Sequence, residues 1–288
     1  MRVPALGAVL LASCGGLSHT LHPDVPRPHR LAVLPVQGAA PFVERELARS
    51  LLRARLQERG YLVAELEFTD RVLSERSWLS DPETFSPASL PLSEVATAIG
   101  VDGVLVVDQF DETRWNALLV RRHALGARFR IVEKDGGEWW QANYTVGVTG
   151  GFLLKSGQLL TELLSQSTHG AGAASLDRID ELVEGVAEVL PVDEDRAEHH
   201  MPPGIAAPVV AAPVVHAISE GLARVEVRVE APPGSSVWLD LGDRLRSMPM
   251  SGANAAYTGA VDVPADWPPL AVRVRVRGAF GQQAEATR

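Results

Sequence analysis

The stretch ARFRIVEKDGGEWWQANYTV, residues 127–146, decides the fold class of this chain. Apolar and polar side chains alternate through both halves, which is the pattern of half-exposed β-strands. Asp135 and Gly136 separate the halves, and this pair is typical of a tight turn between antiparallel strands. The stretch therefore predicts a β-hairpin with one face on a core.

Buried strands and a helix are predicted on the N-terminal side of this hairpin. Short apolar segments at 30–38, 61–68 and 103–110 are typical of buried strands. Leucines at helical spacing predict a helix over 42–59, which Gly60 ends. A strand, helix and strand in this order normally form a parallel, right-handed unit.

Two further helices complete the first domain. Ser93 is expected to cap a helix that runs to Ile99, whereas prolines break 69–92 into turns and loop. A last helix is predicted over 176–190. Its expected apolar face consists of Leu176, Ile179, Leu182, Val183, Val186 and Leu190. Residues 30–190 are thus expected to form an α/β domain, a mixed β-sheet packed with helices.

A second, all-β domain is predicted after a linker. Residues 191–213 hold five prolines with alanines and acidic residues, which is typical of an extended connector. Within residues 214–288, the segments 224–230, 237–241 and 272–277 alternate between apolar and polar positions, and turn residues separate them. They predict a small all-β immunoglobulin-like sandwich.

Arginines dominate one outer face of this second domain. Arg273, Arg275 and Arg277 alternate with valines near the C-terminus. We expect Glu226 or Glu230 to lie opposite one of them on a neighbouring strand. The alternative is a docking surface for an acidic partner.

The single cysteine of the chain, Cys14, follows a short apolar segment. Arg2 and the apolar residues after it are typical of an export signal, and this segment is too short to span a bilayer. The residues Leu11, Ala12, Ser13 and Cys14 resemble the signal-peptidase recognition sequence of bacterial lipoproteins. This resemblance implies that residues 1–13 are removed and that Cys14 carries lipid, which gives stable membrane attachment. The alternative is a plain secretory signal with a buried cysteine.

The chain also resembles a family of bacterial lipoproteins of unassigned role. The resemblance rests on the segments LAVLPV, LARSLLRARLQERGYLV, IGVDGVLVVDQFDE and ARFRIVEKDGGEWWQANYTV. It implies a fold similar to the N-terminal domain of TolB and the periplasmic part of the curli secretion lipoprotein CsgG. It also implies a role in envelope assembly or secretion, with a CsgG-like lipoprotein or a second copy as partner.

The expected location is the outer membrane, facing the periplasm. In lipoproteins of this kind, a residue other than aspartate after the cysteine favours the outer membrane, and here it is Gly15. Residues 14–29 contain three prolines and are expected to form an extended tether.

Composition and motifs favour a protein without catalytic activity. The net charge of −9 is spread along the chain, which excludes the basic footprint of a nucleic-acid-binding protein. No cofactor, metal or catalytic residue is predicted, because the sequence holds no hydrolase or phosphate-binding motif. Asp108, Asp111 and Glu112 at an expected strand end leave a periplasmic hydrolase as an alternative. A small-ligand sensor is a third possibility.

Two further groups of residues have open interpretations. An apolar segment that includes Phe152, Leu153, Leu159 and Leu163 either contacts a partner or packs on the sheet of its own domain. His199 and His200 lack a third metal ligand nearby, so they are interpreted as a solvated pair in the linker.

Overall fold

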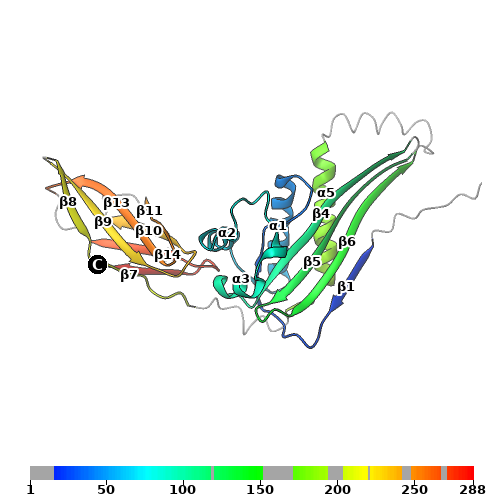
Figure 1. Ribbon diagram of the computed structural model, residues 1–288, viewed down its shortest axis with the longest axis horizontal. Helices are drawn as coiled ribbons and strands as arrows, with labels where there is room; N and C mark the ends of the chain where they lie inside the picture. Colours follow the sequence, from blue (N-terminus) through cyan, green and yellow to red (C-terminus); the bar gives the residue numbers. More distant parts are fainter. Residues whose placement is uncertain are drawn as a thin grey trace, which may run out of the picture.

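The computed structural model describes residues 16–117, 120–151, 171–193, 204–219, 221–241, 248–266 and 271–288. These residues form an elongated molecule in which an α/β unit is followed by a unit built from strands alone (Figure 1). The mixed α/β class is confirmed.

A six-stranded sheet forms the centre of the α/β unit, with the order β1-β6-β5-β4-β2-β3. Strand β2 is parallel to β3 and β4, whereas all other neighbours are antiparallel, so the sheet is mixed as expected. Its strands are β1 (Leu17–Leu21), β2 (Arg30–Val33), β3 (Leu62–Val63), β4 (Gly103–Ala117), β5 (Val120–Glu133) and β6 (Glu138–Gly151).

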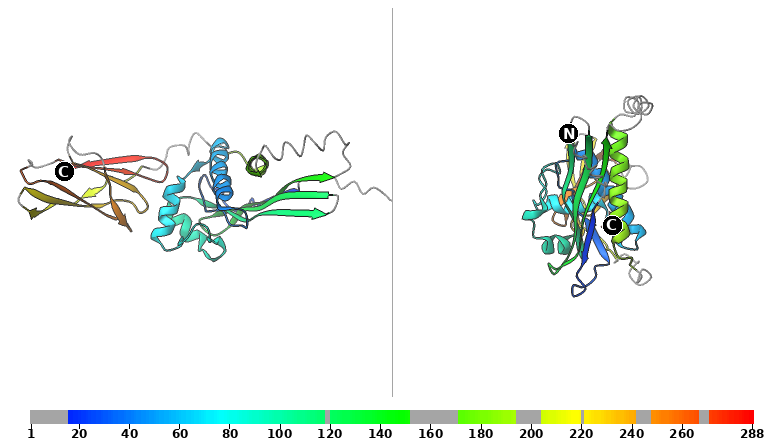
Figure 2. Two further views of the ribbon diagram at one scale, coloured as in Figure 1. Left: turned by 90° about the horizontal axis from the view of Figure 1, so that it is seen from above. Right: turned by 90° about the vertical axis from the view of Figure 1, so that its right-hand side faces the viewer.

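Helices cover both faces of this sheet. Helices α1 (Phe42–Glu58) and α5 (Ala171–Val189) pack on one face, and α2 (Leu66–Glu75) and α3 (Leu92–Ile99) lie on the other (Figure 2). A short 3₁₀ helix, η1 (Pro87–Ser89), precedes α3. Successive residues of β2 contribute to opposite cores, because side chains alternate across a strand. Every residue of β2 after Arg30 is therefore buried.

Helix α1 has the predicted bounds within a residue, and Gly60 follows it with a φ of 95°. Helix α3 ends at Gly100 in the left-handed conformation, as expected. The expected cap, Ser93, is wrong, because Pro91 occupies the cap position and the Ser93 hydroxyl instead donates to the carbonyl of Lys134.

Helix α2 corrects a sequence prediction. The strand expected over 61–68 ends at Val63, and residues from Leu66 onward are helical. Phe68, Val72 and Leu73 of α2 are buried in the core beneath α3. Tertiary packing of this apolar face accounts for a helix where the later prolines of the segment indicated turns.

Helix α5 has the predicted apolar face with one exception. Ile179, Leu182 and Val183 are fully buried, whereas Leu176 is 50% exposed. Leu176 lies one helical turn before Ile179, the first of these buried residues.

Strand β1 overturns the prediction of a free tether over residues 14–29. Residues Leu17–Leu21 pair antiparallel with β6, from Leu17 opposite Tyr144 to Leu21 opposite Trp140. The pairing is continued by His22, whose backbone N–H donates to the carbonyl of Trp139 at 2.9 Å. The prolines that suggested a tether all follow this strand in the sequence. The segment after Cys14 is therefore an edge strand of the sheet.

The C-terminal unit contains two sheets around one core. Their orders are β11-β10-β14-β15 and β12-β13-β9-β7, and β8 also pairs with β9. The core is made mainly of valines that alternate with exposed residues, as the sequence predicts. The strands are β7 (Val209–Val210), β8 (Val214–Ser219), β9 (Leu222–Glu230), β10 (Ser236–Leu241), β11 (Met248–Pro249), β12 (Ser251–Ala253), β13 (Ala256–Pro264), β14 (Val272–Arg277) and β15 (Gln283–Thr287).

Two details of this unit differ from expectation. Strand β7 lies within the expected linker 191–213 yet pairs with β9. Strands β9 and β14 belong to different sheets, so neither Glu226 nor Glu230 lies opposite an arginine of β14. The pairing expected between these two rows is therefore wrong.

Candidate functional site

The residues predicted to carry lipid or contact a partner lie outside the described part of the chain. They are Leu11, Ala12, Ser13 and Cys14 near the N-terminus and Phe152, Leu153, Leu159 and Leu163 after β6; His199 and His200 lie outside it as well. The described structure still limits where Cys14 is attached. Only Gly15 and Gly16 lie between Cys14 and Leu17, and an extended chain covers at most about 11 Å over these three peptide steps.

The acidic group on β4 is an ion-paired part of the sheet. Asp108 and Asp111 flank a β-bulge in which Gln109 has a φ of 56°. They were expected at the end of a strand, but this prediction is wrong, because β4 continues to Ala117. Asp108 pairs with Arg130 at 2.7 Å, and Asp111 accepts from the N–H of Ala39 at 2.7 Å.

The neighbouring acidic residue is also paired. Glu112 lies 3.2 Å from Arg178 of α5, and both side chains are 12% exposed. Together these contacts join β4 to β5, to the loop before α1 and to α5. Acid–base chemistry requires a carboxyl group that reaches a substrate, whereas each of these carboxylates has a partner within the fold.

A second polar cluster lies at the carboxyl end of β2. Arg49 is 1% exposed, and its guanidinium donates to the carbonyl of Val33 at 3.0 and 3.1 Å and to Asp70 at 2.6 and 2.9 Å. Arg45 donates to the carbonyls of Val36 and Glu83. Ligands of α/β proteins often bind at the carboxyl ends of parallel strands. Here the protein's own arginines occupy that place.

A third cluster, which we call the clasp, joins the N-terminal segment to the end of the α/β unit. Arg27 lies 5.8 Å from the centres of the Tyr61 and Trp139 rings. The Tyr61 hydroxyl donates to the carbonyl of Pro191 at 2.6 Å, and burial raises the pKa of Tyr61 to about 12. The clasp therefore holds the segment after β1 against the residues that lead into the linker.

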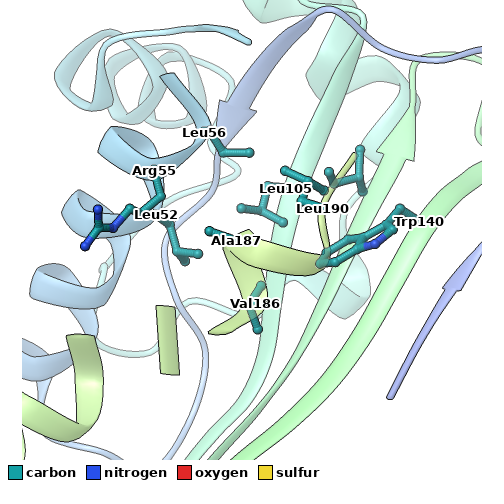
Figure 3. A pocket seen from close by; sticks show the side chains of 9 residues that line it. Leu52, Arg55, Leu56, Leu105, Trp140, Val186, Ala187 and Leu190 are labelled. Carbon is teal, nitrogen blue, oxygen red and sulfur yellow. The ribbon is translucent and has the colours of Figure 1, made fainter. Parts of the chain in front are cut away.

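A small, partly open pocket lies between α1, α5 and the sheet (Figure 3). Its volume is about 10 Å³, which is the space of a single water molecule. Trp140 contributes to the lining, and its buried indole nitrogen has no hydrogen-bond partner among the described residues. The other lining residues are Leu52, Arg55, Leu56, Leu105, Ile131, Val186, Ala187 and Leu190. A cavity of this size does not admit an organic substrate.

A shallow groove of about 340 Å³ lies on the outer face of the β10–β14 sheet. Half-buried Trp238 on β10 lies directly opposite Pro249 on β11 and Arg275 on β14. Arg275 pairs with Asp240 at 2.9 Å. Arg277 and Gln283 complete the polar side of the groove. The groove thus combines one aromatic surface with several hydrogen-bonding groups.

Helix α2 contacts the C-terminal unit through its charged face. Arg277 pairs with Glu65, and Arg71 donates to the carbonyl of Ser235 at 2.6 Å. Glu75 accepts from the backbone N–H groups of Gly234 and Asn254 at 3.2 and 3.3 Å.

Apolar contact accompanies these polar bonds. Ala279, in the turn between β14 and β15, is buried in the core beneath α2 and α3, and Phe280 packs against it. The N–H of Glu65 donates to the carbonyl of Ala279 at 2.7 Å. We call this set of contacts the α2 interface; it joins the two units directly, in addition to the linker.

Neither a metal site nor a membrane-spanning helix is found within the described ranges. No three His, Cys, Asp or Glu side chains in them are grouped so as to hold a metal ion. None of their helices is sufficiently long and apolar to cross a membrane.

Comparisons with known proteins give limited information. No protein-family model and no curated protein matches this chain. Among solved structures, lipoprotein GNA1162 from Neisseria meningitidis is 20% identical with a TM-score of 0.35, and the match covers 49% of this chain and 96% of that one. A PelC dodecamer from Paraburkholderia phytofirmans is 16% identical with a TM-score of 0.33, covering 60% and 98%. The hypothetical protein CT253 from Chlamydia trachomatis is 14% identical with a TM-score of 0.33, covering 56% and 96%. At these TM-scores the resemblance to TolB and CsgG stays a prediction.

Sequence reasoning missed the groove and the α2 interface. A signal for the groove was present, because Trp238 occupies an outward position of the alternating segment 237–241, and an exposed large apolar side chain is informative in itself. The α2 interface had no comparable signal, because Glu65 and Arg277 are far apart in the sequence.

Proposed function

We propose that this protein is a lipid-anchored component of the bacterial envelope that works by binding and assembly rather than by catalysis. Cys14 carries the lipid, residues 1–13 form the signal, and the folded units face the periplasm from the outer membrane. The proposed partner is another envelope lipoprotein or a second copy of the chain.

The observation that carries this proposal is the position of β1. The strand begins three residues after Cys14 and pairs with β6 over its whole length. An acyl anchor at Cys14 is therefore coupled directly to the central sheet. Diacyl or triacyl attachment holds such a protein stably at a membrane without a spanning helix.

The chemistry of the described residues supports a non-catalytic role. The acidic residues on β4 are engaged in ion pairs or backbone contacts. Ion pairs and backbone contacts of this kind hold neighbouring elements together, which is an adequate structural role for these carboxylates.

The anchor is tested by the intact mass of the chain extracted from membranes of the cells that make it. We expect cleavage before Cys14 and added mass from the lipid. Cys14→Ala should leave the precursor uncut, whereas Ser18→Ala, on the exposed edge strand, should be processed normally. Recovery of the natural chain without lipid in the periplasmic fluid would refute the proposal.

A small-ligand sensor is a second candidate, and the groove beside Trp238 favours it. Its aromatic floor and its hydrogen-bonding rim resemble the lining of small-molecule sites, which combine apolar surface with a few polar groups. A ligand of this groove should raise the melting temperature of the protein. That rise should disappear in Trp238→Ala and persist in Arg273→Ala, which changes the same sheet outside the groove. Equal stabilisation of both variants would exclude this site.

A further inference from the structure

Trp238 is the single aromatic side chain among the described residues that line the groove on the β10–β14 sheet. It points away from the core of the C-terminal unit, because its neighbours Val237 and Leu239 are buried and side chains alternate along a strand. Exposed Pro249 on β11 and exposed Arg275 on β14 lie directly opposite it. The indole is thus flanked by a proline on one side and by an arginine on the other.

The arginines of β14 are neutralised by carboxylates of the protein itself. The pairs are Arg273 with Glu285 at 2.8 Å, Arg275 with Asp240 at 2.9 Å, and Arg277 with Glu65 of α2. Three positive charges therefore face three negative ones on this surface. The groove is unsuited to a ligand that is held mainly by its negative charge.

The same ion pairs fix the direction of the hydrogen-bonding groups along the groove. Arg275 donates to both carboxylate oxygens of Asp240, at 2.9 and 3.3 Å, and such a bidentate contact holds the guanidinium in one plane. Gln283 on β15 lies directly opposite Arg277 and adds an amide that both donates and accepts. Groups that are held in place before binding lose less conformational entropy when a ligand arrives.

The position and shape of the groove disfavour several other classes of ligand. A peptide strand adds to the open edge of a sheet, whereas this groove lies on the face, where the backbones of β10 and β14 pair with each other. A proline-rich peptide docks in a groove lined by several aromatic side chains. An apolar metabolite needs a site that removes most of its surface from water, and this groove is shallow.

We propose that the groove binds a neutral saccharide, with the face of one pyranose ring stacked on the indole of Trp238. A sugar ring has C–H groups on its faces and hydroxyl groups around its edge. An aromatic surface beside fixed donors and acceptors matches both. Arg275, Arg277 and Gln283 hydrogen-bond the hydroxyl groups. This inference rests on the small-ligand candidate of the proposed function and names the class of that ligand.

Binding is expected to be weak and independent of salt. A shallow groove leaves much of the ligand in water, so we expect dissociation constants on the order of 0.1–1 mM. Salt screens attraction between charges, and a neutral sugar on ion-paired arginines has little of it to lose. An anionic ligand on the same residues would instead bind more weakly as salt is added.

Isothermal titration calorimetry of the full chain with malto-, cello-, chito- and mannohexaose tests the proposal. We expect at least one of these neutral oligosaccharides to bind equally well at low and high salt. Trp238→Ala should weaken binding by about tenfold or more, whereas Trp238→Tyr keeps an aromatic face and should retain most of it. Gln283→Ala should weaken it by roughly threefold to tenfold. Arg273→Ala, on the same strand but outside the groove, should leave it unchanged.

Three results would overturn the saccharide inference. One is failure of every oligosaccharide to bind, and another is equal affinity of the parent chain and Trp238→Ala. The third is a rise in melting temperature with ATP or a decaproline peptide, but not with any sugar, that disappears in Trp238→Ala. With ATP, this third result would leave the small-ligand candidate standing, so the two failures are distinguishable. Neither affects the anchor at Cys14, which the intact mass tests separately.

Discussion

Arg277 on β14 forms an ion pair with Glu65 at the start of α2, although 212 positions separate the two residues in the chain. The pair connects the C-terminal unit to the α/β unit. It also places one wall of the Trp238 groove against the α2 interface, because Arg277 contributes to both.

The first prediction concerns this ion pair. Glu65→Gln and Arg277→Gln should each lower the free energy of unfolding, and a double-mutant cycle should give a coupling of about 0.5–1 kcal/mol, since Arg277 is 46% exposed. Urea unfolding of the full chain measures it. Arg273→Gln is the control, because Arg273 pairs with Glu285 inside the C-terminal unit. Zero coupling would mean that backbone and apolar contacts alone hold the units together.

The second prediction concerns the buried arginine of α1. Arg49→Ala should lower the free energy of unfolding by about 3–5 kcal/mol, because it leaves the carbonyl of Val33 and the carboxylate of Asp70 without their shared donor. Arg55→Ala on the same helix should change it by less than about 0.5 kcal/mol, since Arg55 is 31% exposed and pairs with exposed Glu58. Similar losses in both variants would contradict a structural role for Arg49.

The third prediction concerns the pH dependence of stability. Burial acts to raise the pKa of Asp102, but hydrogen bonds from the side chain and backbone of Arg30 outweigh it, and the pKa is lowered. A lowered pKa in the folded state gives stability that is present above the unfolded value of 3.8 and lost as pH falls through the folded pKa. Asp102→Asn should therefore cost about 1 kcal/mol at pH 7.

The same variant should also flatten the acid side of the stability profile. Between pH 5 and pH 2, measured by thermal unfolding, Asp102→Asn should lose less stability than the parent chain. Asp262→Asn is the matched control: Arg224 lowers the pKa of Asp262, but this pair is exposed to solvent and screened. An unchanged slope in Asp102→Asn would show that Asp102 does not contribute to acid unfolding.

The fourth prediction separates the buried and exposed positions of α5. Leu182→Ala should lower the free energy of unfolding by about 2–5 kcal/mol, because Leu182 is fully buried between the helix and the sheet. Leu176→Ala should change it by less than about 0.5 kcal/mol, since that side chain is 50% exposed. A large loss in Leu176→Ala would indicate that Leu176 is covered in the working form of the protein.

The sequence predicted those elements that local pattern determines. The hairpin of β5 and β6, helix α1 and the stop at Gly100 follow from period, turn residues and glycine alone. Leu176 shows the limit of this reasoning, since helical period gives the apolar face but not the length of helix that the sheet covers. Strand β1 shows another, because a short polar segment becomes a strand only where β6 offers an open edge.

The candidate sites were less predictable than the fold. Asp108 and Asp111 were recognised as a charged group, but their partners Arg130 and the N–H of Ala39 depend on strand register and on the bulge at Gln109. The groove depends on Trp238, Pro249 and Arg275 meeting across three strands. Contacts of this kind depend on tertiary structure, which sequence periodicity alone does not predict.

The early start of β1 has a mechanical consequence for an acylated form of the protein. Only Gly15 and Gly16 lie between Cys14 and β1, so the central sheet would stay within about 11 Å of the lipid attachment point. The C-terminal unit lies at the end of the elongated molecule that is remote from β1 (Figure 1). In an acylated molecule, the distance from the membrane at which a partner meets the C-terminal unit would then be set by the length of the protein itself.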